Sequence, residues 1–393
     1  MSFASRNQII SLLLSALAVA CLLGVWGYSH FTAGSAHRPA AVPVVPAPRA
    51  TPVPARQVKT GRTPSAMEVD PVDGHAFVAD LTDNTVSMYE VRHLRRIKVI
   101  PVGQRPVKLE YDQRSSRVFV VNESGNSVTV LAAATGRLIG TTPVGRSPET
   151  VAVDEATNRA FVANYGSATV SLLDATTGKL LRAVPVGTGP IAATADQSLN
   201  RVVVVNRGSV DTDRQPTGDS TADILDGRTG ASLRVLRVGT YASAVQIDET
   251  THRAYVANYG SDSVSMIDLV HNTVVATMPV GKHPSALGIA QAAGHVFVTN
   301  FGANTVSMLN ARSGGVSREI GVGAGPWTIE VDARGHAYVS ETATGRVAVL
   351  DTVRGVVTRT VATGESPSEV GVDDRTGQVF VVNTRSNSIS VID

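Results

Sequence analysis

The feature that most constrains this chain is a repeat of about 42 residues that begins at Gly61 and continues to the end. Each copy opens with a G-x-x-P turn, and the glycines of these turns are Gly61, Gly103, Gly145, Gly187, Gly239, Gly281, Gly323 and Gly364. Proline is present in seven of the eight turns, and Ala242 replaces it in the fifth. Successive glycines lie 42, 42, 42, 52, 42, 42 and 41 residues apart. A period of this length is typical of solenoids and propellers, in which each unit packs against its neighbours.

Within each copy, apolar residues alternate with a period of two, which predicts strands and not helices. In the third copy, four short apolar runs are separated by turns of Gly, Asn, Asp and Thr, and they cover residues 151–153, 161–164, 169–174 and 180–186. Four strands in each of eight copies predict an all-β chain, with residues 56–393 folded as an eight-bladed β-propeller of four-stranded blades.

The two ends of the repeat region predict how the ring closes. The last copy stops at Asp393, after its third strand, and a spare strand at 56–60 precedes the first G-x-x-P turn. We therefore expect the N-terminal strand to complete the last blade. A seven-bladed ring is the alternative, and it would leave one whole unit unpacked.

Several copies carry a recognisable sequence pattern. The pieces FVANYGSATVSLLDATTG (161–178), YVANYGSDSVSMID (255–268) and FVTNFGANTVSMLN (297–310) alternate with PVG turns. The pattern resembles the YVTN-type β-propeller repeat of bacterial and archaeal envelope proteins. The resemblance implies an exported protein but no particular activity, because such scaffolds range from surface-layer proteins to the d-type haem domain of nitrite reductase.

The N-terminal part predicts export. Residues 1–8 form a basic n-region, and residues 9–28 contain no charge over 20 positions, which is the length of a membrane-spanning helix. Three outcomes are open: a retained signal anchor, a signal peptide cleaved after Ala36, or lipid attachment at Cys21. Each of them places the remainder in the periplasm or at the cell surface. Residues 29–55 are rich in Pro and Ala and are expected to form a stalk.

Charge and cysteine content exclude several classes of function. The formal net charge is +2, but the first 61 residues hold five basic and no acidic side chains. The remainder therefore carries 30 basic and 33 acidic residues, and a basic nucleic-acid footprint is absent from it. Cys21 is the only cysteine, so the repeat region has no disulfide, no Cys-ligated zinc and no c-type haem.

Residues that recur in most copies are predicted to be structural. An Asn ends the second strand of most copies, where we expect it to bond its own backbone and start a turn. An Asp ends the first strand in seven copies, at Asp70, Asp112, Asp154, Asp196, Asp248, Asp332 and Asp373. We interpret these Asp residues as turn formers and not as metal ligands.

Residues that break the repeat are the candidate functional residues. Carboxylates occupy the inner first strand in blades seven, eight, one and two, at Glu330, Glu369, Glu68 and Glu110. We call these four the acidic arc. Asp80 and Glu341 replace the common Asn, and Arg62, Arg105 and Arg146 stand in nearby turns. Three interpretations remain open: Glu–Arg pairing between blades, a cation or polar-ligand site, and a catalytic acid/base pair.

A second group of exceptions lies on the face that carries the G-x-x-P turns. Tyr241, His283 and Trp327 stand in or just after these turns, and the loop after Asn206 is ten residues longer than in other copies. We predict that this loop is a flap over the mouth of the central channel. Exposed aromatic side chains on a rigid scaffold favour recognition, so this face is the predicted binding surface.

The sequence favours a non-enzymatic binding or scaffolding protein of the cell envelope, built as a monomeric propeller. Its expected partner is an envelope protein, a peptide or a polysaccharide. No catalytic nucleophile is predicted, because the chain lacks a nucleophile elbow. No cofactor is predicted either, because no His stands on a first strand to hold haem. The alternative is a metal-assisted hydrolase or lyase, or a redox propeller, with a divalent cation or cofactor held by the acidic arc.

Overall fold

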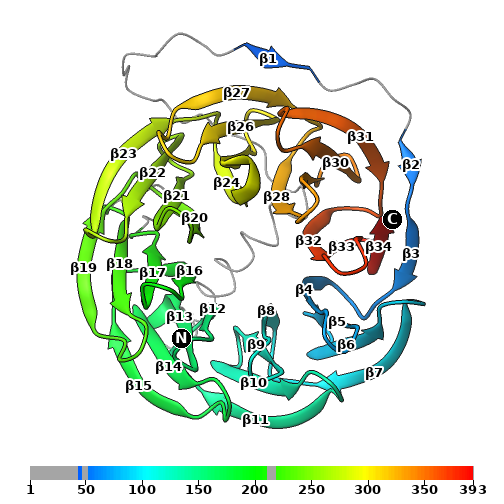
Figure 1. Cartoon of the computed structure of the whole chain (residues 1–393). Coiled ribbons are helices and arrows are strands. Elements are labelled where there is room, and N and C mark those ends of the chain that lie inside the picture. The colour runs from blue at the N-terminus through cyan, green and yellow to red at the C-terminus, as the bar shows by residue number, and fades with distance from the viewer. Residues whose placement is uncertain (1–42, 47–51, 210–217, 393) are drawn as a thin grey trace, which may run out of the picture.

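A computed structural model describes residues 43–46, 52–209 and 218–392 of this chain. Its strands form eight sheets arranged around a central axis, with the first strand of each sheet nearest the centre (Figure 1). Among the described residues there is no α-helix, and the only helical turns are the 3₁₀ turns Tyr165–Ser167 and Gln291–Ala293. The predicted eight-bladed propeller of four-stranded blades is confirmed.

Each blade is an antiparallel meander that runs from the centre outward. The first strands of blades 1 to 8 are β4 (Pro64–Asp70), β8 (Pro106–Asp112), β12 (Pro148–Asp154), β16 (Pro190–Asp196), β20 (Ala242–Asp248), β24 (Pro284–Ala290), β28 (Pro326–Val331) and β32 (Pro367–Asp373). The second strands are β5 (His75–Asp80), β9 (Arg117–Asn122), β13 (Arg159–Asn164), β17 (Arg201–Asn206), β21 (Arg253–Asn258), β25 (His295–Asn300), β29 (His336–Glu341) and β33 (Gln378–Asn383).

The outer half of each blade holds the third and fourth strands. The third strands are β6 (Thr85–Glu90), β10 (Ser127–Ala132), β14 (Thr169–Asp174), β18 (Thr221–Asp226), β22 (Ser263–Asp268), β26 (Thr305–Asn310), β30 (Arg346–Asp351) and β34 (Ser388–Ile392). The fourth strands are β7 (Arg95–Pro101), β11 (Arg137–Pro143), β15 (Leu180–Pro185), β19 (Ser232–Arg237), β23 (Thr273–Pro279), β27 (Val316–Gly321), β31 (Val356–Ala362) and, in blade 8, β3 (Arg56–Lys59).

The N-terminal strand closes the ring as the sequence predicted. β3 pairs antiparallel with β34, in a register that places Arg56 opposite Val391 and Lys59 opposite Ser388. The two ends of the repeat region therefore share one sheet. This arrangement closes the ring without a disulfide and leaves no whole unit unpacked, so the seven-bladed alternative is wrong for this chain.

The described part of the predicted stalk lies along the rim of the propeller. β1 (Val44–Val45) adds a fifth, parallel strand to β27 of blade 6, and β2 (Val53–Pro54) does the same to β31 of blade 7. The amide of Ala55 donates to the carbonyl of Ala362 at 2.9 Å. Proline is tolerated on an outer strand because no further strand requires its missing N–H.

Residues 1–42 lie outside the described part of the chain, so the predictions of an n-region, signal anchor and cleavage site stay predictions. Among the described residues, no helix has both the length and the apolar character needed to span a bilayer. The centre of the predicted flap, residues 210–217, also lies outside the described part.

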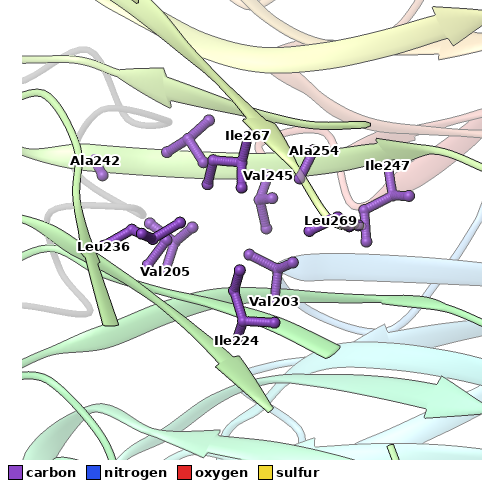
Figure 2. Close-up of a cluster of buried hydrophobic side chains, with 12 residues drawn as sticks. Val203, Val205, Ile224, Leu236, Ala242, Val245, Ile247, Ala254, Ile267 and Leu269 are labelled. Carbon is purple, nitrogen blue, oxygen red and sulfur yellow. The ribbon is translucent and has the colours of Figure 1, made fainter. Parts of the chain in front are cut away.

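The hydrophobic core is divided among the spaces between neighbouring blades. Figure 2 shows one of these clusters, in which Val203 and Ile224 of blade 4 meet Val245 and Ile247 of blade 5. The intervening residues of the same strand, Val202 and Val204, pack on the other side against blade 3. Because successive side chains of a strand point to opposite faces, each blade supplies both of its neighbours. The period of two in the sequence thus reflects which of the two neighbouring core clusters each side chain enters.

The common Asn braces its blade and does not start its own turn, which corrects the sequence interpretation. In blade 2 the amide nitrogen of Asn122 donates to Ser127 and Thr129 on the third strand. In blade 8 the amide of Gly364 donates to Oδ1 of Asn383 at 3.0 Å. A Cβ atom added at Gly103 would lie 2.5 Å from Cγ of Asn122, so the turn glycine makes room for the Asn side chain.

The recurring Asp residues form turns, as predicted. Oδ1 of Asp70 accepts hydrogen bonds from the amides of Val72 and Asp73, and Oδ1 of Asp373 accepts from Arg375 and Thr376. Each carboxylate therefore satisfies the backbone donors of the connection that follows its strand.

Candidate functional site

The G-x-x-P turns lie beside the connections between the second and third strands, and together these segments form one face of the disc. In blade 5 the amide of Tyr259 donates to the carbonyl of Tyr241, and the amide of Gly260 donates to that of Thr240. The same pair of bonds joins Phe301 to His283 and Gly302 to Lys282 in blade 6. We call this surface the G-x-x-P face.

The acidic arc lies at the centre of the ring and contains a lysine that the sequence reading missed. Nζ of Lys108, on β8, lies 2.6 Å from Oε1 of Glu369, on β32. This ion pair links blades 2 and 8 across blade 1. Lys108 also interacts electrostatically with Glu68, Glu110 and Glu330, so one ammonium group serves four carboxylates.

Three carboxyl groups of this arc, those of Glu68, Glu110 and Glu330, have pKa values above that of an ordinary glutamate. Burial raises the pKa of Glu110 and of Glu330 to about 7, with Lys108 opposing the rise and Glu369 adding to it. Burial and the neighbouring Glu110 raise the pKa of Glu68 well above its usual value. Glu330 keeps the most accessible surface of the three, so solvent screens its charge most.

Lys108 responds in the opposite sense. Burial alone would lower its pKa, but Glu369, Glu68 and Glu110 raise it above the usual value. The ammonium group of Lys108 therefore stays charged at neutral pH. Glu110 and Glu330 can therefore exchange protons near neutral pH, and the cation beside them is the side chain of Lys108.

The three predicted arginines do not pair with the acidic arc. Nε of Arg62 lies 2.5 Å from Asp83 in its own blade, and Nε of Arg105 lies 3.2 Å from Glu123 in its own blade. Arg146 is exposed and makes no ion pair with a described residue. The expected Glu–Arg pairing between blades is therefore replaced by the Glu369–Lys108 pair.

Asp80 and Glu341 are buried braces. Asp80 is 0% exposed and accepts hydrogen bonds from the amide of Gly61 and the hydroxyl of Ser87. Glu341 is 2% exposed and accepts from the amide of Gly323 at 2.7 Å. Both residues accept a hydrogen bond from the amide of the turn glycine, as Asn383 does in blade 8. Because both carboxylates are buried, they add no exposed charge to the G-x-x-P face.

A row of aromatic side chains crosses blades 4 to 6 on the G-x-x-P face. The guanidinium of Arg207 lies 4.6 Å from the ring centre of Tyr241, and the rings of Tyr241 and Tyr259 are 5.8 Å apart. Tyr259 in turn stacks on His283 at 4.7 Å, with an angle of 9° between the rings. Two of the three predicted residues, Tyr241 and His283, are thus brought together through Tyr259.

Trp327, the third predicted residue, extends this row into blade 7. Its indole packs edge-on against Phe301 of blade 6, with ring centres 5.7 Å apart. At the other end, Tyr165 of blade 3 lies under the electrostatic influence of Arg207 and Tyr241. The side chains of the row are half-buried. We call this set the aromatic arc, and its members are Tyr165, Arg207, Tyr241, Tyr259, His283, Phe301 and Trp327.

The sequence contained a signal for the four members that were missed. Tyr165, Arg207, Tyr259 and Phe301 all follow the strand-ending Asn directly, in four consecutive blades. The same position holds Leu81, Glu123, Thr342 and Thr384 in the other blades. A Tyr-Gly pair is also an ordinary turn sequence, so only the contrast between the two halves of the ring distinguishes these positions.

A smaller charged group borders the aromatic arc in blades 2 and 3. Burial and the nearby Glu123 raise the pKa of Glu149 to about 7, while Arg207 and Arg105 oppose the rise. Among the described residues, no three His, Cys, Asp or Glu side chains are arranged to hold a metal ion. The first strands also carry no His or Cys, the usual axial ligands of haem.

Comparison with known proteins supports the fold and leaves the activity open. A family model described as "Lactonase, 7-bladed beta-propeller" matches residues 82–200, which is less than a third of the chain. The chain is a β-propeller protein. The number of blades differs from that family description, because eight sheets surround the axis here. No curated protein matches the chain.

Solved structures of similar fold cover most of the ring. Hydrazine synthase of Kuenenia stuttgartiensis is 17% identical, with a TM-score of 0.59 over 85% of this chain and 97% of that one. BamB of Moraxella catarrhalis is 16% identical, with a TM-score of 0.65 over 87% and 99%. Dihydro-heme d1 dehydrogenase NirN, solved in complex with DHE, is 14% identical, with a TM-score of 0.64 over 85% and 78%. At these identities the likeness concerns the fold alone.

Proposed function

We propose that this chain is an exported binding protein of the cell envelope that recognises its partner on the G-x-x-P face. The observation that carries the proposal is the aromatic arc, whose half-buried side chains form two contact groups. Arg207, Tyr241, Tyr259 and His283 make up the first, and Phe301 and Trp327 make up the second. Tyr, Trp and Arg are the residues most enriched at the energetic centres of protein interfaces. Support for export comes from the uncharged residues 9–28 and the resemblance to envelope repeat proteins.

The scaffold suits this role because the arc is held by backbone bonds on a rigid ring. The amides of Tyr259 and Phe301 are tied to the neighbouring G-x-x-P turns. A partner that binds here therefore orders few side chains on the propeller, which limits the entropic cost of binding.

The test is a capture experiment with the full chain, extracted in detergent and immobilised, using envelope extract from its own cells. We compare wild type with Tyr241→Ala/Trp327→Ala and with a matched rim control, Leu233→Ala/Val235→Ala. Leu233 and Val235 are exposed apolar residues on β19, outside the arc. We expect the same partner with wild type and the rim control, and its loss with the arc variant. Equal capture by all three proteins contradicts the proposal.

A second candidate, a hydrolase, lyase or redox protein that uses the centre of the ring, is favoured by one observation. Burial raises the pKa of Glu110 to about 7, which is near the value that a general acid or base requires. Metal analysis of the purified chain, followed by Glu68→Gln, tests it. A stoichiometric divalent cation that is lost in Glu68→Gln would favour this candidate over a binding protein.

A further inference from the structure

The third residue of every G-x-x-P turn has a left-handed backbone. Their φ angles lie between 47° and 70°, at Thr63, Arg105, Ser147, Gly189, Tyr241, His283, Gly325 and Ser366. Glycine adopts this conformation without strain, and it stands there in blades 4 and 7. The eight positions form a ring of equivalent sites on the G-x-x-P face.

Bulky side chains occupy three of these sites, at Arg105, Tyr241 and His283, although large residues fit the left-handed conformation poorly. A left-handed backbone crowds the Cβ atom, and large residues are rare there unless the surroundings hold them. Tyr241 has φ of 52° and His283 has φ of 55°. The fold itself does not require either ring, because glycine performs the turn in two other blades.

The surroundings are shaped to hold these two rings. A Cβ atom at Gly302 would lie 2.5 Å from Nδ1 of His283, so the glycine leaves space for the imidazole. A Cβ atom at Gly260 would lie 2.9 Å from Cβ of Tyr241. Tyr259 then fills the gap between Tyr241 and His283. Tyr241 and His283, both in the left-handed conformation, thus pack with Tyr259 into one preorganised surface.

The same part of the face carries three cations that form no ion pair within the described part of the chain. Arg146, Arg207 and Lys282 make no ion pair with a described residue. Asp219 pairs with Arg237, which leaves Asp262 and Glu149 as the acids beside this part of the face. Among the described residues, three cations therefore face two acids around the aromatic arc, and the balance is positive.

We infer that the aromatic arc binds an acidic, aromatic-containing polypeptide segment of a protein partner, and that Tyr241 and His283 are its specificity-determining residues. This inference rests on the proposed function and adds the chemistry of the partner. The rings supply rigid apolar contacts, and Arg146, Arg207 and Lys282 attract the carboxylates. Tyr and Arg at the centre of the row favour a polypeptide over a polysaccharide.

The test uses fluorescently labelled random copolymers as probes, titrated with the full chain in detergent and followed by anisotropy. A glutamate–tyrosine copolymer is compared with a lysine–tyrosine copolymer and with polygalacturonate. We expect the glutamate–tyrosine copolymer to bind at least about tenfold tighter than either of the others. Equal binding of the two copolymers, or no binding by wild type, overturns the inference. Preferential binding of polygalacturonate assigns the surface to an acidic polysaccharide and overturns it too.

Paired glycine variants separate recognition from structure. Tyr241→Gly/His283→Gly removes the two rings, and Thr63→Gly/Ser366→Gly makes the same backbone change in blades 1 and 8, outside the arc. Glycine relieves the left-handed strain but removes side-chain contacts in both variants, among them the hydrogen bond from Thr82 to Thr63, so we expect both variants to fold with a Tm close to that of wild type. The first should lose about tenfold or more in copolymer affinity, and the second should bind like wild type. Equal affinities of the two variants overturn the inference.

Charge is tested with Arg146→Gln, because Arg146 is exposed and makes no ion pair with a described residue. Its copolymer affinity should fall several-fold at low salt and approach wild type at high salt. Unchanged affinity at both salt concentrations contradicts the charge argument. If the copolymers fail while capture of the natural partner still depends on Tyr241 and Trp327, the inference is wrong and the proposed function stands. If capture is also independent of these residues, both are wrong.

Discussion

The acidic arc and the aromatic arc occupy different parts of the same ring and use their unusual residues in different ways. In the acidic arc, Lys108 pairs with Glu369 and lies near the three other carboxyl groups, so the cation that stabilises the group comes from the chain itself. In the aromatic arc, Arg207 lies over Tyr241 and near Glu149, and it forms no ion pair with a described carboxylate. A break in a repeat therefore has two meanings. A residue that departs from the repeat stabilises the fold where its interaction partners lie within the chain. It indicates recognition where such partners are missing from the chain.

The largest expected effect comes from removing the internal cation. Lys108→Met leaves four carboxylates without their ammonium group, and we expect a loss of about 2 kcal/mol in the free energy of unfolding at pH 7. This is less than the roughly 3–5 kcal/mol of a fully buried pair, because the side chains of Lys108 and Glu369 are 31% and 22% exposed. Urea denaturation measures the loss. Arg62→Met, which breaks an exposed pair, is the control and should cost less than about 0.5 kcal/mol. Equal losses would show that the acidic arc is not balanced by Lys108.

The next effect is a pH dependence located in the acidic arc. The pKa of Glu110 is about 7 in the fold and lower in the unfolded chain, so the fold binds more protons between these two values. Its contribution to stability therefore falls as pH rises from about 4.5 to 7. Glu110→Gln carries no charge to bury, and we expect it to exceed wild type by about 1 kcal/mol at pH 8 and to match it near pH 5, after allowance for solvent screening. Denaturation at both pH values checks this sign, and the reverse order would contradict it.

The smallest effect tests whether Asp80 is a brace. Asn stands at the equivalent position in six of the other blades and donates to the third strand, as Asn122 does. Burial raises the pKa of Asp80, so its charge is held at a cost. Asp80→Asn should leave stability within about 0.5 kcal/mol of wild type, or slightly above it, and should leave partner capture unchanged. A loss of capture would place Asp80 in the recognition surface after all.

Periodicity was sufficient to predict the ring, but contacts between blades were not visible in the sequence. The 42-residue spacing and the spare strand at 56–60 predicted eight blades and their closure, because a repeat repeats its packing. Lys108 lies on the same strand as Glu110, but its partner Glu369 is 261 residues away. The sequence does not show that these two residues meet, and the role of Lys108 was therefore missed. The pairing of Val44 and Val53 with the rim was missed because a Pro-rich segment carries no strand signal of its own.

The candidate surface was predicted in part for a similar reason. Tyr241, His283 and Trp327 stood out because they interrupt a turn motif. Tyr259 did not, because a Tyr before Gly reads as part of a turn until its ring is seen between Tyr241 and His283. Position in a repeat predicts which face a residue occupies, while the rotamer and the neighbour across the blade boundary decide what it contacts.

The central claim is that the two arcs divide recognition from stability, and one capture experiment tests it directly. Wild type, Tyr241→Gly/His283→Gly and Glu330→Gln are immobilised as full chains and exposed to the same envelope extract. The account predicts that the partner is retained by wild type and by Glu330→Gln and is lost from the double variant. Loss of the partner in Glu330→Gln, together with its retention by Tyr241→Gly/His283→Gly, would contradict the account.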